Sequence, residues 1–149
     1  MVFTEQLSVR THGNTHILDI TADIQAAITK SDLSSGIATL FNVGSTAGLT
    51  TIEYEPGLVN HDMETAFEKI APQNGTYEHE KTWHDDNGHA HVRASLLGPS
   101  LTVPFVDGRL TLGTWQQIVL IDFDTRDRNR TCLLYTSDAA DEEDSVDLG

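Results

Sequence analysis

The residues best suited to chemistry gather in one short run, His89–Ser95, which reads HAHVRAS. Its alternation favours a strand, and a period of two places His89, His91 and Arg93 on one face. Two imidazoles so placed can bind one metal ion or one anion, and His84 with nearby aspartates is available to complete a metal site. The alternative is that these polar residues form the solvated face of an edge strand.

Carboxylate and hydroxyl groups supply a second set of candidates. Asp62 stands at the start of a predicted helix, where capping of the helix end explains it as well as catalysis does. The turn Gly44–Gly48 and the following Thr50 and Thr51 offer hydroxyls and backbone amides that can cradle an anion. Turns are built from such residues in any case, so both interpretations stay open.

Two arginines could neutralise a bound phosphate. Arg93 lies in the histidine run, and Arg109 follows the turn Asp107-Gly108. A guanidinium binds phosphate bidentately, and it also pairs with carboxylates, of which this chain has many. We therefore keep an ion-pairing role open for each arginine.

Strands, more than helices, must position these residues. The patterns predict two helices, both in the first half of the chain, so strands and helices do not alternate as in a doubly wound sheet. We expect an α+β fold, mostly antiparallel sheet or sandwich, with two helices on one side. The predicted strands are Phe3–Thr11 in a hairpin with His16–Ile20, then Ile37–Val43, Leu49–Tyr54, His89–Leu97, Leu101–Val106, Leu110–Leu112 and Thr114–Asp124, and the helices contain Ile24–Leu33 and Met63–Ile70.

Length and charge restrict the class of protein. A chain of 149 residues suits one domain, and it has no apolar run of the ~18 residues that a membrane span needs. A cytoplasmic location is the expectation. The formal net charge of -14 disfavours nucleic acid and anionic membranes as partners, because like charges repel before contact.

The C-terminal segment, residues 132–149, differs from the rest. It holds six acidic residues, no basic residue and the only cysteine of the chain. Its beginning, CLLYTSDAADE, looks like the translation of a common transposase sequencing adapter, and a native acidic tail is the alternative. We expect the domain to span residues 1–131 and leave the segment out of the fold prediction. The remainder has 17 acidic and 9 basic residues, a net charge of -8.

Two long strings carry a resemblance to a known family. GSTAGLTTIEYEPGLVNHD (44–62) and NGHAHVRASLLGPSLTVPFVDGRLTLGTWQQIVLIDFDTRDR (87–128), with their spacing, resemble the YjbQ-like family, also called the secondary thiamine-phosphate synthase family. The resemblance covers nearly all of residues 1–131. It implies a compact α+β homotrimer with a polar pocket near subunit boundaries, and a weak synthase activity beside an unsettled physiological role.

The resemblance also assigns expected roles. The reaction joins a pyrimidine methyl diphosphate to a thiazole phosphate and releases pyrophosphate, so a divalent metal, Mg or Zn, is a candidate cofactor. The alternative is a non-catalytic trimeric module that binds a metal or a phosphorylated metabolite. The expected residues are His89, His91 and Asp62 for catalysis, Thr50, Thr51, Arg109 and Gln116 for phosphate binding, and His84, His89 and His91 for a metal.

Overall fold

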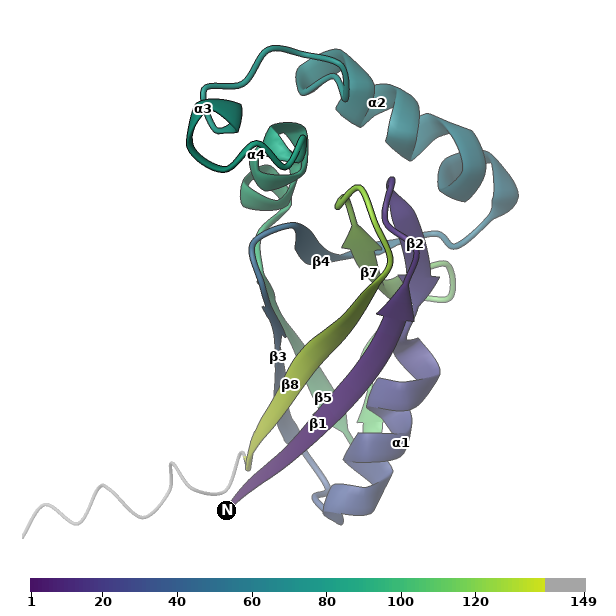
Figure 1. The fold of residues 1–149 in the computed structure, drawn as a ribbon. Helices are drawn as coiled ribbons and strands as arrows, with labels where there is room; N and C mark the ends of the chain where they lie inside the picture. Colours follow the sequence, from purple (N-terminus) through teal and green to yellow (C-terminus); the bar gives the residue numbers. More distant parts are fainter. Residues whose placement is uncertain (139–149) are drawn as a thin grey trace, which may run out of the picture.

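A computed structural model describes residues 1–138, which form two antiparallel sheets with helices packed against them (Figure 1). The α+β class is confirmed. One sheet has the order β1 (Val2–Thr11), β8 (Arg128–Asp138), β3 (Gly36–Val43), β5 (Ser100–Val106) and β6 (Arg109–Leu110). The other has the order β2 (His16–Asp19), β7 (Gln117–Asp122) and β4 (Ala47–Ile52).

The helical elements fall into two groups. Helix α1 (Thr21–Ser31) lies along the strands, whereas α2 (Met63–Ile70), α3 (Glu80–Trp83) and α4 (Gly88–Leu97) gather over one end of the sheets (Figure 1). A π-helical turn, η1 (Leu58–Asp62), runs directly into α2. The expected pair of helices is thus present, and the helices that gather around α4 cover the end where the β3–β4 turn lies.

Two apolar clusters hold this arrangement. The larger one joins α1 to both sheets through fully buried side chains such as Ile28, Leu40 and Leu120. The smaller one lies under the helical end, where the Phe67 and Phe123 rings meet edge to face at 4.7 Å. Full burial of such a side chain contributes about 1.5–3 kcal/mol, so the second cluster fixes α2 and α4 on the three-stranded sheet.

The predicted hairpin between the first two strands is wrong. β1 pairs with β8, whereas β2 pairs with β7 in the other sheet. The link between them has three consecutive residues at positive φ, namely Gly13, Asn14 and Thr15. This left-handed backbone carries the chain from one sheet to the other instead of folding it back on itself.

The predicted strand His89–Leu97 is also wrong, because this segment is helix α4. Its buried residues include His89, Ala90, Arg93 and Ala94, which recur at intervals of four as one face of a helix does. The run is rich in alanine and leucine and has only one β-branched residue, so helix propensity agrees with the observed structure. The common face assigned to His89 and His91 therefore does not exist.

The predicted domain boundary at residue 131 falls inside β8. Residues 132–138 continue that strand between β1 and β3, with Cys132, Leu134 and Thr136 buried. The adapter-like origin of residues 132–149 stays a prediction, and residues 139–149 lie outside the described part of the chain. Among residues 1–138, no helix is both long and apolar enough to cross a membrane.

Candidate functional site

The predicted site residues occupy separate places in one copy of the chain. Asp62 is exposed at the end of η1 and makes no capping hydrogen bond to the helix that follows. Arg109 is exposed on β6, in the hairpin that packs near α1, and His84 is exposed at the end of α3. On β4, Thr51 accepts a hydrogen bond from Gln116 Nε2 at 3.0 Å, with Thr50 beside it.

His89 and His91 have different surroundings, because residues two apart on a helix point to nearly opposite sides. The His89 side chain is buried, and its Nδ1 has no hydrogen-bond partner among the described residues. Burial, followed by the charge of Arg93, lowers the pKa of His89. His91 is half-buried with its ring 4.4 Å from that of His79, and burial, followed by this neighbour, lowers the pKa of His91.

The donor set proposed for a metal is not brought together. Within residues 1–138, no group of three or more histidine, cysteine, aspartate or glutamate side chains is arranged to hold a metal ion. His84, His89 and His91 do not fit a common ion, because His89 is enclosed under α4 while His91 faces outward. We therefore assign no reaction step to a metal, and a bound Mg or Zn ion stays a prediction.

Arg93 resolves one of the open alternatives in favour of ion pairing. Its guanidinium is buried and donates to Glu68 Oε2 at 2.6 Å and to the Ala71 carbonyl at 2.9 Å. It also donates to Thr15 Oγ1 at 3.1 Å. These bonds fasten the end of α2 and the β1–β2 link to α4, so Arg93 positions the helix rather than a ligand.

His91 lines a cavity of about 410 Å³ between α4 and the turn that joins β3 to β4. The turn contributes Gly44 and Ser45, α4 contributes His91 and Ser95, and Phe41 forms an apolar wall. Two backbone bonds fix this approach of helix and sheet: Asn42 N–H donates to the Pro99 carbonyl at 2.8 Å, and Leu49 N–H to that of Gly98 at 3.0 Å. An imidazole, hydroxyls and a glycine turn thus face one space.

A buried network of charged groups lies at the base of the β3–β4 turn. Arg130 on β8 donates from Nε to Asp122 Oδ2 at 2.6 Å and from Nη2 to Asp122 Oδ1 at 2.8 Å. Arg130 Nη2 also donates to Thr46 Oγ1 at 2.7 Å, and Thr46 donates to Asp124 Oδ2 at 3.0 Å. Because Asp122 belongs to β7, the network joins the two sheets beneath the turn.

Asp124 is held ionised inside this network. Burial alone would raise its pKa, but hydrogen bonds from the Thr125 backbone, Thr46 and Arg128 hold the pKa of Asp124 below its ordinary value. Arg128 Nε donates to Asp124 Oδ2 at 2.8 Å. The two aspartates and the two arginines of the network therefore carry equal and opposite charges, and each charge has a partner.

These network residues are not among the predicted site residues, although the sequence pattern contains a signal for them. Asp122 lies in phase with the buried Leu120 of its strand, and Arg130 lies in phase with the buried Cys132. Charged side chains are seldom fully buried unless they are paired. An aspartate and an arginine at inward positions of two strands therefore indicate a buried ion pair.

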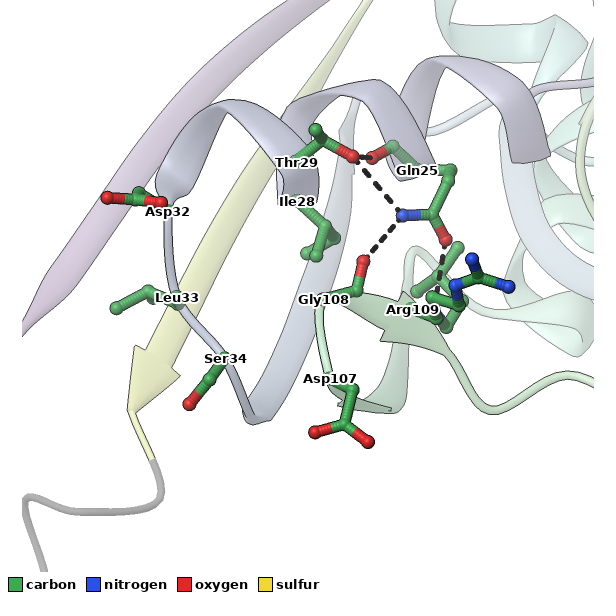
Figure 2. Close-up of a pocket in the computed structure, with 10 residues that line it drawn as sticks. Gln25, Ile28, Thr29, Asp32, Leu33, Ser34, Asp107, Gly108 and Arg109 are labelled. Carbon is green, nitrogen blue, oxygen red and sulfur yellow. Dashed lines mark hydrogen bonds between the residues drawn. The ribbon is translucent and has the colours of Figure 1, made fainter.

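A larger cavity, about 680 Å³, lies at the other end of the molecule, between α1 and the β5–β6 hairpin. Figure 2 shows Gln25 at its centre: Nε2 donates to the Gly108 carbonyl at 2.8 Å, and Oε1 accepts from Leu110 N–H at 3.0 Å. Gly108 N–H in turn donates to the Ser34 carbonyl at 2.7 Å. These groups are used to hold the hairpin, so this cavity is structural. Arg109 lies here and not beside His91.

Relatives with similar sequences cover most of the chain. A UPF0047 protein of Methanothermobacter thermautotrophicus is 36% identical over 123 residues, which cover 83% of this chain and 84% of that protein. The UPF0047 protein YugU of Bacillus subtilis is 35% identical over 129 residues, covering 86% and 94% of the two chains.

Solved structures agree in fold and family. A crystal structure of a YbjQ-like protein of unknown function from Sulfolobus solfataricus has a TM-score of 0.85 and 30% identity, covering 91% of this chain and 96% of that one. A YjbQ/UPF0047 protein of Clostridium acetobutylicum has a TM-score of 0.80 and 33% identity, covering 89% and 99%. The sequence model of the family described as "UPF0047 protein YjbQ-like" matches residues 5–138. The chain therefore belongs to the YjbQ/UPF0047 family, as its motifs predicted.

Proposed function

We propose that the chain binds a phosphorylated small molecule in the cavity beside His91. The observation that carries this proposal is the meeting of the His91 imidazole with Ser45 and Gly44 in one open cavity. Because the pKa of His91 is lowered, its imidazole is neutral near pH 7 and offers one N–H donor and one acceptor. The Ser45 hydroxyl is a second donor for phosphate oxygens.

The reaction we propose for this cavity is the thiamine-phosphate synthesis that the family resemblance implies. The thiazole nitrogen attacks the methylene carbon of the pyrimidine methyl diphosphate, a carbon–nitrogen bond forms, and the carbon–oxygen bond breaks with its electron pair leaving on pyrophosphate. Donors fixed around the leaving group stabilise its developing charge. The Phe41 ring beside His91 suits the flat face of a pyrimidine or thiazole.

A non-catalytic binding module is the second candidate, and the dispersal of the predicted residues favours it. Asp62, Arg109 and the Thr51–Gln116 pair lie outside the His91 cavity of a single copy. A cavity with donors for a phosphate, but without these groups, is sufficient for binding. Turnover with the two substrates, measured as pyrophosphate release, separates the two candidates.

We also propose that the outer face of the five-stranded sheet forms the interface of a homotrimer, and a cytoplasmic location stays a prediction. The face carries exposed apolar side chains on adjacent strands, with Phe41 opposite Leu133. Its large side chains are Ile37, Phe41 and Val43 on β3, Tyr135 on β8 and Val106 on β5. A contiguous apolar patch of this kind marks a contact surface. Since Phe41 also lines the His91 cavity, the interface would adjoin the site.

Calorimetric titration of inorganic pyrophosphate into the full chain tests the binding proposal. We expect saturable binding that is lost in His91→Ala and kept in His61→Ala, which removes an exposed imidazole of the η1 turn. Equal binding by both variants would remove the His91 cavity from consideration. Binding lost in His84→Asn but kept in His91→Ala would instead restore the predicted role of His84.

Light scattering tests the trimer separately. We expect a mass of about three chains for the unaltered protein and a smaller particle for Phe41→Glu, because a charge in the centre of an apolar interface is left without a partner. Ala26→Glu, a change at an exposed position of α1, is the control for an added charge away from this face. A monomer before any substitution would contradict the trimer.

A further inference from the structure

The guanidinium of Arg130 has one nitrogen left over. Nε and Nη2 are committed to Asp122 and Thr46, whereas Nη1 makes no hydrogen bond to any residue between 1 and 138. The side-chain atoms that are both fully enclosed and without a hydrogen-bond partner do not include Nη1. Because Nη1 has no such partner, it must be accessible at the surface. A side chain that is only 8% exposed therefore presents one N–H₂ group outward.

Gly44 is the residue that leaves this group uncovered. A Cβ at position 44 would lie 3.0 Å from Arg130 Nη1, and the backbone there has φ of +141°, a conformation that disfavours other residues. Gly44 also lines the cavity beside His91 and Ser45. Glycine at this position thus leaves Arg130 Nη1 uncovered beside a residue that lines the cavity.

We propose that Arg130 Nη1, reached over Gly44, binds an anionic oxygen of the ligand and makes the site specific for phosphate or diphosphate groups. This inference rests on the proposed function and names the group that distinguishes a charged ligand from a neutral one. A guanidinium N–H bond to a phosphate oxygen is charge-assisted, which makes it about twice as strong as a neutral hydrogen bond. His91 and Ser45 supply the neutral donors of the same site.

The network makes Arg130 a fixed donor. Its guanidinium plane is held by two bonds to Asp122 and one to Thr46, so binding immobilises no flexible side chain. The formal charges of Asp122, Asp124, Arg128 and Arg130 cancel. Nη1 therefore contributes an oriented hydrogen bond to the ligand more than a net positive charge. From this balance we expect affinity that changes little with added salt.

A second unsatisfied group lies at the same turn. Asn42 is fully buried and donates from Nδ2 to the Ala47 carbonyl at 3.1 Å, while its Oδ1 has no partner among residues 1–138. The same Nδ2 lies 3.9 Å from the position of a Cβ on residue 44. Buried polar atoms normally have a partner, so a donor and an acceptor left open beside Gly44 indicate a site that a ligand or water completes.

Titration of inorganic pyrophosphate into Gly44→Ala tests the inference without removing any charged group. We expect binding weaker by roughly tenfold or more, because the new methyl covers Nη1. Gly108→Ala is the matched control, since position 108 also has a positive φ, +69°, but a Cβ there meets nothing within 4 Å. Thermal unfolding of both variants confirms that each one is folded.

A second measurement uses the unaltered protein. In ¹⁵N spectra of the arginine side chains, pyrophosphate should shift the Nη resonance of Arg130, which is assigned from its disappearance in Arg130→Lys. Binding that depends on His91, is unchanged in Gly44→Ala and leaves the Arg130 resonance in place would overturn the inference while the proposed function stands. Absence of any pyrophosphate binding by the unaltered protein would overturn both.

Discussion

The two cavities at opposite ends of the molecule differ in what their polar groups do. In the larger one, Gln25 and the hairpin backbone satisfy one another, and the space is left over from packing a helix on a turn. At the other end, on β3 and around α3 and α4, lie the buried side-chain atoms that have no hydrogen-bond partner among residues 1–138. They are Asn42 Oδ1, Asn87 Oδ1, His89 Nδ1 and His79 Nε2, the last of which lies 3.5 Å from Asp85 Oδ1. Of these residues, Asn42 lies beside Gly44, so an open acceptor, more than volume, distinguishes the candidate site.

The two arginines at these ends give the largest contrast. Arg130→Met leaves the buried Asp122 without its ion-pair partner and removes one of the two arginines beside Asp124, so we expect a loss of about 3–5 kcal/mol in the free energy of unfolding. Arg109→Met, at the exposed cavity near α1, should change it by no more than about 0.5 kcal/mol. Urea denaturation measures both. Equal and small changes would mean that the network does not hold the sheets together.

A comparison within β8 sharpens the role of the segment after residue 131. Leu134 is fully buried between the sheets, so Leu134→Ala should cost about 2–5 kcal/mol. Leu133 points to the outer face and is half-buried, so Leu133→Ala should cost clearly less in the monomer. Denaturation curves of the two variants measure the difference. If neither change affects stability, residues 132–138 are not part of the folded domain, as the boundary at residue 131 predicted.

Stability and binding should separate between Gln25 and Ser45. Gln25→Ala removes both side-chain bonds to the β5–β6 hairpin and leaves a partly buried carbonyl and amide unpaired, for a loss of about 1–3 kcal/mol over the two bonds. It should leave pyrophosphate binding unchanged. Ser45→Ala, at an exposed turn, should show the reverse: stability within about 0.5 kcal/mol and weaker binding. Denaturation measures the stability of both variants, and calorimetry measures their pyrophosphate binding. If one variant loses both stability and binding, the contrast between the two cavities is wrong.

Much of the fold could be predicted because its signals are local. The hairpin at Asp107-Gly108 forms as expected, and strands β3 and β4 and helices α1 and α2 lie where the patterns place them. The strand prediction for residues 89–97 failed because the apolar residues there satisfy a period of two as well as a period of four. Helix propensity together with the packing of Ala90 and Ala94 against the sheet, a tertiary effect, decides in favour of the helix.

The site could be predicted only in part, because it depends on contacts between distant strands. The turn at Gly44–Gly48 and His91, both named from the sequence, lie together at the proposed site, and their role in binding stays a prediction. Arg130 was not, because its partner Asp122 lies in the other sheet and no local spacing relates them. The predicted hairpin of β1 and β2 was wrong for a related reason, since strand pairing across sheets is not encoded in neighbouring residues.

The smallest expected effect is the pH dependence that the histidines around α4 impose on stability. In the folded protein the pKa values of His89 and His91 are lowered, mainly by burial, so between their folded values and the ordinary 6.5 the unfolded chain binds more protons. Their contribution to the free energy of unfolding is complete above the ordinary pKa of 6.5 and is lost as the pH falls below it. Urea denaturation from about pH 8 down to pH 5 should therefore show declining stability, with a shallower decline in His91→Gln. Carboxylates with lowered pKa values, such as Asp124, act only at still lower pH, so they do not obscure this window. Stability that rises towards pH 5 would mean that the imidazoles are held in their charged form, and it would reverse the assignment of His91 as a neutral donor.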